Sequence, residues 1–281
     1  MFVYEMLRKT HPVKGMFGIE IEVEGRRLPE VVYGNWEVDM NEGSLRDGGL
    51  EYITRTPSNL PAIMEDVAAL KKQFLDNSSS PNFSPRTSVH AHVNVTDLTF
   101  NQLCNFIFIS FLLEGNLSHF CGKVRRGNQF CIPGKNAEGV FDIVENIFTN
   151  KSFSEFSVPR NYRYSFINLT SLNKYGSLEF RGMRGTLDKR VIKSWLETLQ
   201  RFKNTAREYT SPVELISDIK RKGLKKFCNS LITKGYQFPS QHIDRREAFN
   251  ILRTLVVLTE DWDEPLTRTV NTHPDNPFLR G

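Results

Sequence analysis

The amino-acid sequence predicts an α+β protein in which the strands come before most of the helices. Two observations carry this prediction. All segments with a strand pattern, which are short and β-prone or alternate apolar with polar residues, lie before residue 188. From Asp188 onward the apolar residues recur with helical periodicity. A doubly wound parallel sheet would instead alternate strands and helices along the chain, so the sequence favours the α+β class.

The expected elements follow one another with turn residues between them. Strands are expected over 17–24, 50–54, 88–95, 162–169 and 177–181, and helices over 58–75, 100–120, 140–148, 188–208, 212–232 and 243–259. Ser58 opens the first helix, with Pro61 in its first turn. Residues 77–81 are expected to form a loop, and the tail 261–281 to drape over the surface. We expect one main domain over 1–210, with 211–281 as a helical extension packed on it.

The composition is that of an ordinary globular protein. Of 281 residues, 39% are hydrophobic and 25% are charged, which excludes wholesale disorder and a collagen-like chain. The 37 basic and 32 acidic residues give a net charge of +5, much of it in segments 123–135 and 220–226. A solvated helix face is the simpler interpretation of the second segment, and an anionic partner is the alternative.

Cysteine spacing and hydropathy indicate a cytoplasmic protein. The four cysteines form no Cys-x-x-Cys pair, so we expect reduced thiols and no zinc site. The N-terminus carries Glu5 where a signal peptide needs apolar residues. The most apolar window, 103–113, has 11 residues, whereas a bilayer needs about 20. We therefore expect a buried helix there and no membrane span.

The first strand carries a row of acidic side chains. Side chains alternate between the two faces of a strand, so Glu20, Glu22 and Glu24 share one face, about 6–7 Å apart. At an effective dielectric near 20 each neighbouring pair would repel by roughly 2–3 kcal/mol, but by roughly 0.6 kcal/mol in open water. The row is therefore either exposed on an edge strand or directed into a concave site where cations neutralise it.

Two later strands repeat this design. Segment 88–95 places Ser88, His90, His92 and Asn94 on one face and apolar residues on the other. Segment 177–181 likewise presents Glu179 and Arg181 opposite Leu178 and Phe180. Taken singly, the histidines could belong to a wetted face and the Glu–Arg pair could be a cross-strand ion pair. Together, the three strands favour a site for metal ions and anions on one face of a sheet.

Further candidates are less sharply defined. Glu51 follows Gly48 and Gly49, whose lack of a side chain allows close approach, and it is a plausible ligand. Turns are rich in acids, so Asp39, Glu42 and Asp47 are weaker candidates. Arg163 and Asn168 lie five positions apart and on opposite faces of a regular strand, so only a bulge or turn would bring both to one site.

The expected ligands indicate the kind of ion. Oxygen donors with a single histidine favour Mg²⁺ or Mn²⁺ over zinc, and magnesium in a carboxylate cage usually handles nucleotide phosphates. No Walker motif is present, because six residues separate Gly127 from Gly134 and Asn136 follows Lys135. No Gly-x-Gly-x-x-Gly occurs either. ATP would therefore bind through a different architecture.

The order of the motifs resembles that of a known family. The motifs are Gly-Ile-Glu20-Ile-Glu22, Glu42-Gly-Ser-Leu with Gly49-Leu-Glu51 and Thr56-Pro57, His90-Ala-His92-Val-Asn94, Arg163-Tyr164 with Asn168-Leu169, and Ser177-Leu-Glu179-Phe-Arg181. Between residues 15 and 190 this order is similar to that of the amidoligases, often phage-encoded relatives of glutamine synthetase and glutamate–cysteine ligase. Two positions depart from the family pattern: Glu42 stands where Asp is more common, and Ser177 where Thr is often found.

The resemblance implies a curved, largely antiparallel sheet with helices packed on its convex side. Its concave face would hold ATP and two or three Mg²⁺ ions, with Mn²⁺ as an alternative. The implied reaction joins a carboxylate to an amine, with ATP giving ADP and phosphate through an acyl phosphate. The two substrates could be small molecules, peptides or proteins in the cytoplasm, or in the host cytoplasm for a phage protein. An oligomer is compatible with the resemblance, because glutamine synthetase relatives often assemble.

Site roles follow from the same resemblance. Glu22 and Glu51 would hold the metal beside the substrate carboxylate, and Glu20, His90 and Glu179 would hold the metal that bridges the ATP phosphates. His92, Asn94, Asn168 and Arg163 would bind the nucleotide. Arg163 and Arg181, with Glu51, would act in catalysis, the arginines steadying the γ-phosphate or the acid substrate.

Two other functions remain open at this point. A metal-dependent hydrolase could use the same ligands, and a phage structural or nucleic-acid-binding protein could use the basic segment 219–226. Nucleic acid is the less favoured partner. The cationic, glycine-rich loop 122–137, which includes Arg125 and Arg126, is a candidate lid in the ligase hypothesis.

Overall fold

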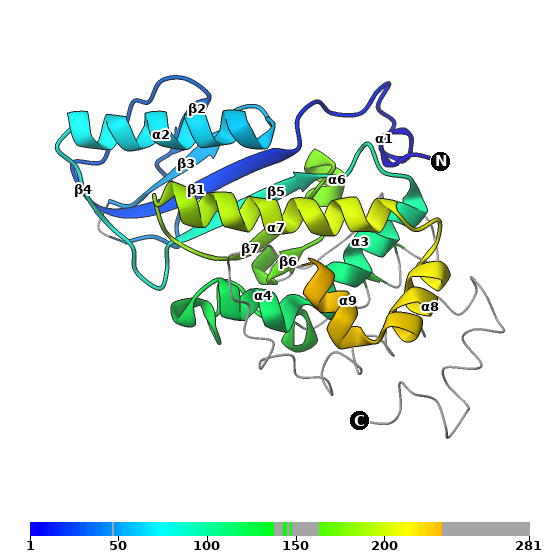
Figure 1. Ribbon diagram of the computed structural model, residues 1–281. Helices are drawn as coiled ribbons and strands as arrows, with labels where there is room; N and C mark the ends of the chain where they lie inside the picture. Colours follow the sequence, from blue (N-terminus) through cyan, green and yellow to red (C-terminus); the bar gives the residue numbers. More distant parts are fainter. Residues whose placement is uncertain (47, 138–142, 145–146, 148–162, 232–281) are drawn as a thin grey trace.

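The computed structural model describes residues 1–46, 48–137, 143–144, 147 and 163–231 (Figure 1). The expected helix over 243–259, the tail 261–281 and Asp47 lie outside the described residues, as does most of the expected helix over 140–148.

A seven-stranded antiparallel sheet forms the centre of the described structure. Its order is β2-β3-β1-β5-β7-β6, and β4 pairs with the far end of β1. The strands are β1 (Phe17–Arg26), β2 (Trp36–Asp39), β3 (Leu50–Thr54), β4 (Ser80–Asn82), β5 (Ser88–Asn94), β6 (Ile167–Asn168) and β7 (Ser177–Arg184). The predicted mixture of a largely antiparallel sheet with helices is confirmed.

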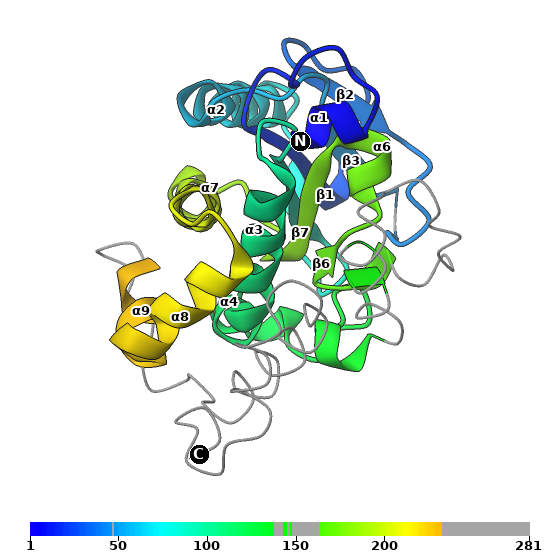
Figure 2. The ribbon, with the colours of Figure 1, turned by 90° about the vertical axis from the view of Figure 1, so that its right-hand side faces the viewer.

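Helices α2, α7 and α3 lie over one face of the sheet, as the two ribbon views show (Figures 1 and 2). The helices are α1 (Val3–Met6), α2 (Leu60–Asp76), α3 (Phe100–Leu112), α4 (Glu114–Phe120), α6 (Ser171–Tyr175), α7 (Lys189–Arg207), α8 (Pro212–Lys222) and α9 (Leu224–Leu231), with 3-10 turns at Lys123–Arg125 and Gly134–Asn136. The described part of the C-terminal extension packs on α3 and α7.

The helix-covered face of the sheet is apolar. Ile19 and Val93 are fully buried, and Phe180 packs its ring against Phe106 of α3 and Trp195 of α7, with ring centroids 5.8 and 6.2 Å apart. Burying each such side chain stabilises the fold by roughly 1.5–3 kcal/mol. Because the helices take this face, the polar residues that alternate with these positions lie on the opposite one.

A bulge in β7 keeps this alternation in step beyond Arg181. Three residues on β5, from Val89 to Ala91, face four on β7, from Met183 to Phe180. The extra residue returns Met183 to the core, where it is fully buried. Without a bulge, Met183 would share the polar face with Arg181, because side chains alternate along a strand. The sequence-based strand therefore ended too early, at Arg181.

The predicted helix over 100–120 is two helices. The chain bends by 60° between α3 and α4 at Leu113. Both carboxylate oxygens of the buried Glu114 accept the backbone N–H of Gly134, at 3.0 and 2.9 Å. In the described part of the chain, no single helix is long and apolar enough to cross a membrane. The bent pair of α3 and α4 together has the length and composition of such a span. Almost every side chain of α3 is buried in the protein, however.

Other element boundaries also differ from the sequence-based ones. Asn59, not Ser58, caps α2 by accepting the N–H of Ala62, because Ser58 bridges to Phe17 of β1. The predicted helix over 212–232 divides at Gly223, whose φ of +82° is the left-handed region that favours glycine. The strand predicted over 162–169 is reduced to β6, and β2, β4 and α6 were not foreseen.

We predict that Gly182→Ala destabilises the protein by about 1–3 kcal/mol, because overpacking forces neighbours to shift. A Cβ at Gly182 would lie 1.9 Å from the ring of Phe166. Gly115→Ala in α4 is the control: nothing lies within 4 Å of that Cβ, so it should be neutral or up to about 1 kcal/mol stabilising. Urea unfolding of both variants checks this, and equal stabilities would contradict the packing.

Candidate functional site

Strand register brings the predicted ligands together on the polar face. Residues paired across antiparallel strands point to the same side of the sheet. The pairs are Glu22 with Glu51, Glu20 with His90, His92 with Glu179, and Glu179 with Asn168. Four acidic residues and two histidines from β1, β3, β5 and β7 thus converge, as the sequence-based hypothesis requires.

His90 is the centre of this cluster. Its Nδ1 atom lies 2.9 Å from Glu20 Oε2, 3.6 Å from Glu179 Oε1 and 3.8 Å from Glu51 Oε1. On the other side of the ring, Nε2 lies 2.6 Å from Ser88 Oγ and 3.8 Å from Glu22 Oε1. The side chain is only 2% exposed, so these contacts fix the imidazole between two sets of carboxylates.

Glu20 also pairs with the second histidine. Burial by itself raises the pKa of Glu20, but the charge of His92 and hydrogen bonds from His90 and His92 hold the pKa well below its usual range. His92 Nε2 lies 3.1 Å from Glu20 Oε1, and Nδ1 lies 3.1 Å from Ser177 Oγ. Burial lowers the pKa of His92, but the charge and hydrogen bond of Glu20 and the charge of Glu179 together raise it overall. Each member of this pair therefore favours the charged form of the other.

Glu179 is held from two sides. Asn168 Nδ2 donates to Glu179 Oε2 at 2.6 Å, and Arg181 pairs with Oε1. Burial raises the pKa of Glu179, but the charges of Arg181, His92 and His90 together outweigh it and the pKa is lowered. Burial likewise disfavours the charge of Arg181, but Glu179, Glu22 and Glu20 raise its pKa overall. Arg181 is thus the protein's own cation among the carboxylates.

Glu51 shows that the carboxylates outnumber the cations. Burial, together with the charges of Glu20, Glu22 and Glu42, raises its pKa to about 10. Glu51 is therefore protonated at neutral pH in the metal-free protein. An added cation would allow it to ionise.

The donor atoms fit divalent ions. Glu20, His90 and Glu179 form one group and Glu22, Glu51 and His90 another, each with its donor atoms within 4.8 Å of one another. Neighbouring ligands of an octahedral Mg²⁺ lie about 3 Å apart, so modest closure around an ion would suffice. Carboxylate oxygens with one nitrogen suit Mg²⁺ or Mn²⁺. The family resemblance implies His90 only in the first group, whereas here His90 is within reach of both.

Several predicted site residues have other contacts. Asn94 donates to the carbonyls of Val13 and Gly15, both at 2.7 Å, and its Oδ1 accepts from Thr96, so it holds the loop before β1. Glu24 accepts the N–H of Arg46 at 3.0 Å.

Arg163 and Asn168 do not lie in the same site, in keeping with the regular strand pattern, which placed them on opposite faces. Arg163 is exposed, and its guanidinium lies 4.8 Å over the ring of Tyr164, outside the carboxylate cluster. Arg181 lies over the same ring at 6.0 Å, so Tyr164 links the two arginines. Asn168 positions Glu179, as described above.

Asp39 and Glu42, from the β2–β3 region, lie at the margin of the carboxylate cluster. Asp39 pairs in register with Glu51, but its Oδ1 accepts the N–H of Asn41 at 2.7 Å. Glu42 accepts the N–H of Ser44 at 3.0 Å and adds to the charge that Glu51 experiences. Both carboxylates shape local turns beside the cluster.

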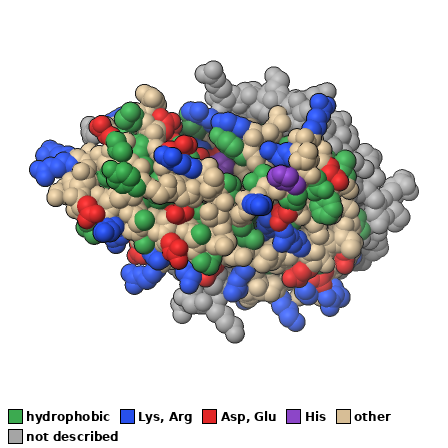
Figure 3. Space-filling model, turned by 90° about the horizontal axis from the view of Figure 1, so that it is seen from above, with side chains coloured by type: hydrophobic (Ala, Val, Ile, Leu, Met, Phe, Trp, Pro, Cys, Tyr) green, Lys and Arg blue, Asp and Glu red, His purple; other side chains and the backbone are tan. Residues whose placement is uncertain are grey.

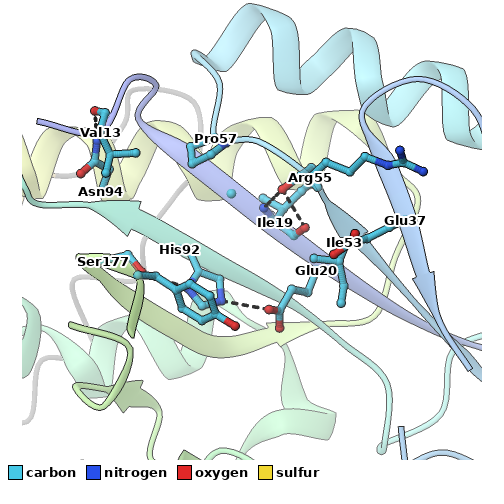
Figure 4. Close-up of a pocket in the computed structure, with 13 residues that line it drawn as sticks. Val13, Ile19, Glu20, Glu37, Ile53, Arg55, Pro57, His92, Asn94 and Ser177 are labelled. Atoms are coloured by element: carbon cyan, nitrogen blue, oxygen red, sulfur yellow. Dashed lines mark hydrogen bonds and ion pairs between the residues drawn. The ribbon is translucent and has the colours of Figure 1, made fainter. Parts of the chain in front are cut away.

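A pocket of about 230 Å³ adjoins the cluster at Glu20 and His92 (Figure 4). Its lining is Val13, Gly18, Ile19, Glu20, Glu37, Ile53, Thr54, Arg55, Pro57, His92, Asn94, Tyr175 and Ser177. Figure 4 shows the guanidinium of Arg55 directed away from Glu20; its Nε donates to the carbonyl of Trp36 at 2.7 Å. Sequence reasoning missed Tyr175 and Ser177 as pocket residues, although Ser177 begins a strand already identified.

The candidate lid contains a structural arginine. Arg125 is 2% exposed and donates to the carbonyls of Pro85 and Arg181, at 3.2 and 2.9 Å. It ties the loop to the segment before β5 and to β7. Among the arginines named for the lid, only Arg126 reaches the surface, beside His119.

One comparison with known proteins gives a match. A family model described as "Putative amidoligase enzyme" matches residues 58–203, more than half of the 281 residues. The matched region includes His90, His92, Glu179 and Arg181, and β1 and β3 precede it. No curated protein matches the chain.

We predict that Glu51→Gln flattens the pH dependence of stability in the presence of a chelator. Because the pKa of Glu51 in the fold is about 10 against a usual 4.5, the folded state retains a proton that the unfolded state loses. Stability therefore falls as pH rises between these values, and glutamine removes this contribution. Melting temperatures from about pH 6 to about pH 9 measure it.

His92 contributes a slope of the same sign to both proteins, so the difference between them isolates Glu51. The control Glu65→Gln, an exposed position on α2, should keep the wild-type slope. Parallel curves for wild type and Glu51→Gln would contradict the crowding of carboxylates at this site.

Proposed function

This chain belongs to the amidoligase family, and we propose that it is an ATP-dependent ligase that joins a carboxylate to an amine. The observation that carries the proposal is the carboxylate cluster around His90, flanked by Arg181 and His92. Membership in the family supports ligase activity as such. ATP dependence, Mg²⁺ and an acyl-phosphate intermediate are our additions, argued from the charges and donor atoms of the site.

The sheet supports this proposal through its two different faces. Helices cover one face, and the other presents donor atoms from four neighbouring strands. We propose that this arrangement is of the glutamine synthetase and glutamate–cysteine ligase type, with the ligand face forming the floor of the active site.

We assign Glu20, His90 and Glu179 to one ion and Glu22 and Glu51 to a second. Their donor atoms gather closely enough to hold divalent ions, and Glu51 needs a cation to ionise at neutral pH. When bound, such ions would neutralise phosphate charge and align it for transfer.

The chain's own cations would complete the charge balance. Arg181 is anchored by Glu179, and its planar guanidinium would steady a phosphoryl group or the acid substrate. His92 borders the pocket and carries a raised pKa, which suits a contact with phosphate. We propose that the pocket beside His92 takes the nucleoside, with Tyr175 and Pro57 as its apolar walls.

The proposed reaction has two steps. A carboxylate oxygen of the acid substrate attacks the γ-phosphorus of ATP, and ADP leaves, giving an acyl phosphate. The amine then attacks the acyl carbon, the C–N bond forms, phosphate departs, and the amine nitrogen loses a proton. A free carboxylate is a poor acceptor for an amine, and the mixed anhydride supplies the leaving group that it lacks.

The nucleic-acid alternative finds less support in the described surface. In the basic segment at the end of α8, Arg221 and Lys222 both pair with Asp218. On the face shown in Figure 3, the described basic side chains are interspersed with acidic ones. Nucleic-acid backbones favour a continuous basic stripe, so we interpret the segment as a solvated helix face.

We predict that ADP release requires an amine and a carboxylate together, and that Glu20→Gln lowers its rate at least 100-fold. Glu20 contacts both histidines and faces the pocket, so in this proposal its charge binds the ion and positions His92 for the phosphate. A coupled ADP assay over acid–amine pairs is the measurement, with Glu65→Gln as the charge-matched control. Product release without ATP would instead indicate the hydrolase alternative.

A further inference from the structure

The buried hydroxyl of Ser88 bridges the two groups of candidate ligands. Ser88 Oγ lies 2.6 Å from His90 Nε2 and also donates to Glu22 Oε2. Ser88 is 1% exposed and lies on β5, two positions before His90 and on the same face. We propose that Ser88 is a positioning residue that decides which of the two ions His90 binds. This inference rests on the metal centre of the proposed function.

The direction of the hydrogen bonds follows from the atoms available. A hydroxyl has one hydrogen to donate, and a carboxylate only accepts. Because the Ser88 hydrogen points to Glu22, Oγ must accept the hydrogen on His90 Nε2. Nδ1, which contacts Glu20 Oε2 at 2.9 Å, is then the nitrogen left to an ion, which would take the place of the hydrogen in that contact. A partner that fixes the orientation and tautomer of a ligating histidine is a common feature of metal sites.

The surroundings of Nδ1 select the ion. Nδ1 is closest to Glu20 and Glu179, at 2.9 and 3.6 Å, and Glu51 Oε1 follows at 3.8 Å. On the other side of the ring, Ser88 lies between Nε2 and the Glu22 carboxylate, whose Oε1 is 3.8 Å from that nitrogen. His90 therefore binds the ion of Glu20 and Glu179, and the ion of Glu22 and Glu51 has oxygen ligands only.

The same hydroxyl constrains the second group. Because Glu22 Oε2 accepts from Ser88, its other oxygen, Oε1, is left for an ion. One side chain thus orients a ligand of each group. The two ions should then differ in affinity, since one has a nitrogen donor and the other has none.

Ser88 is a poor candidate for a nucleophile, although Ser88, His90 and Glu20 form a hydrogen-bonded series. Its hydroxyl is buried and points to a carboxylate. No substrate carbonyl could approach it without displacing Glu22. The contacts instead indicate a role in holding His90 and Glu22.

Binding of Mn²⁺ alone, followed by electron paramagnetic resonance without ATP or substrates, tests the proposal. Ser88→Ala should weaken the tighter of two Mn²⁺ sites by roughly 10- to 100-fold, the usual effect of removing such a partner. Ser88→Thr keeps the hydroxyl and should restore most of the affinity. Ser110→Ala should bind as wild type does, because Ser110 is an equally buried serine on α3 whose hydroxyl has no hydrogen-bond partner in the described structure.

Nitrogen-15 NMR of the histidine rings gives a readout that a merely structural role would not change. In the Mg²⁺-loaded wild type, His90 should carry its hydrogen on Nε2, and Ser88→Ala should show a mixture of tautomers. Ser88→Cys, with a weaker donor, serves if the alanine variant does not fold, and it should fall between alanine and wild type.

Three results would overturn the proposal in different ways. Unchanged Mn²⁺ affinity and an unchanged tautomer in Ser88→Ala would remove the role of Ser88 and leave the proposed function intact. Covalent labelling of Ser88 by a fluorophosphonate would show a nucleophile instead. Failure of the wild-type protein to bind Mn²⁺ at all would remove the metal centre itself, and the proposed function with it.

Discussion

Mutual repulsion among buried carboxylates is the constraint on which the rest of this structure depends. Glu20, Glu22, Glu51 and Glu179 meet on one face of the sheet, where little water screens them. Arg181 lies among these carboxylates, and the charges of Glu179, Glu22 and Glu20 raise the pKa of its guanidinium. Glu51 remains protonated despite this. A site built in this way favours positive charge, and Arg181, the two histidines and a proton on Glu51 offset the negative charge of the carboxylates.

The sheet makes this crowding tolerable by separating it from the core. Helices α2, α3 and α7 bury the apolar face, so the energy that folds the chain comes from residues that the site does not use. The bulge in β7 contributes to this separation, because Glu179 and Arg181 lie on the polar face while Met183 lies in the core. Bulges are common beside active sites for this reason.

Hydrogen bonds from neighbours then fix the ligand atoms. Asn168 orients Glu179, Ser177 contacts His92, and Ser88 contacts both His90 and Glu22. These neutral side chains add no charge to the cluster, so they can hold a carboxylate or an imidazole without competing with an ion. The consequence for an amidoligase is a site whose carboxylates and histidines are already in place before any ligand arrives, which lowers the cost of ordering them on binding.

The sequence by itself determined the faces: alternation placed Glu20, His90 and Glu179 opposite the apolar residues, because the strand period of two is a local property. The sequence could not determine which strands are neighbours, since the β1–β5 and β5–β7 pairings join residues 68 to 96 positions apart. Only the tertiary structure showed that Asn94 supports a loop, that Arg125 is internal and that Arg163 lies outside the cluster. A side chain's partners depend on long-range packing. The local sequence pattern therefore identifies candidate site residues, and only the tertiary contacts decide which of them lie in the site.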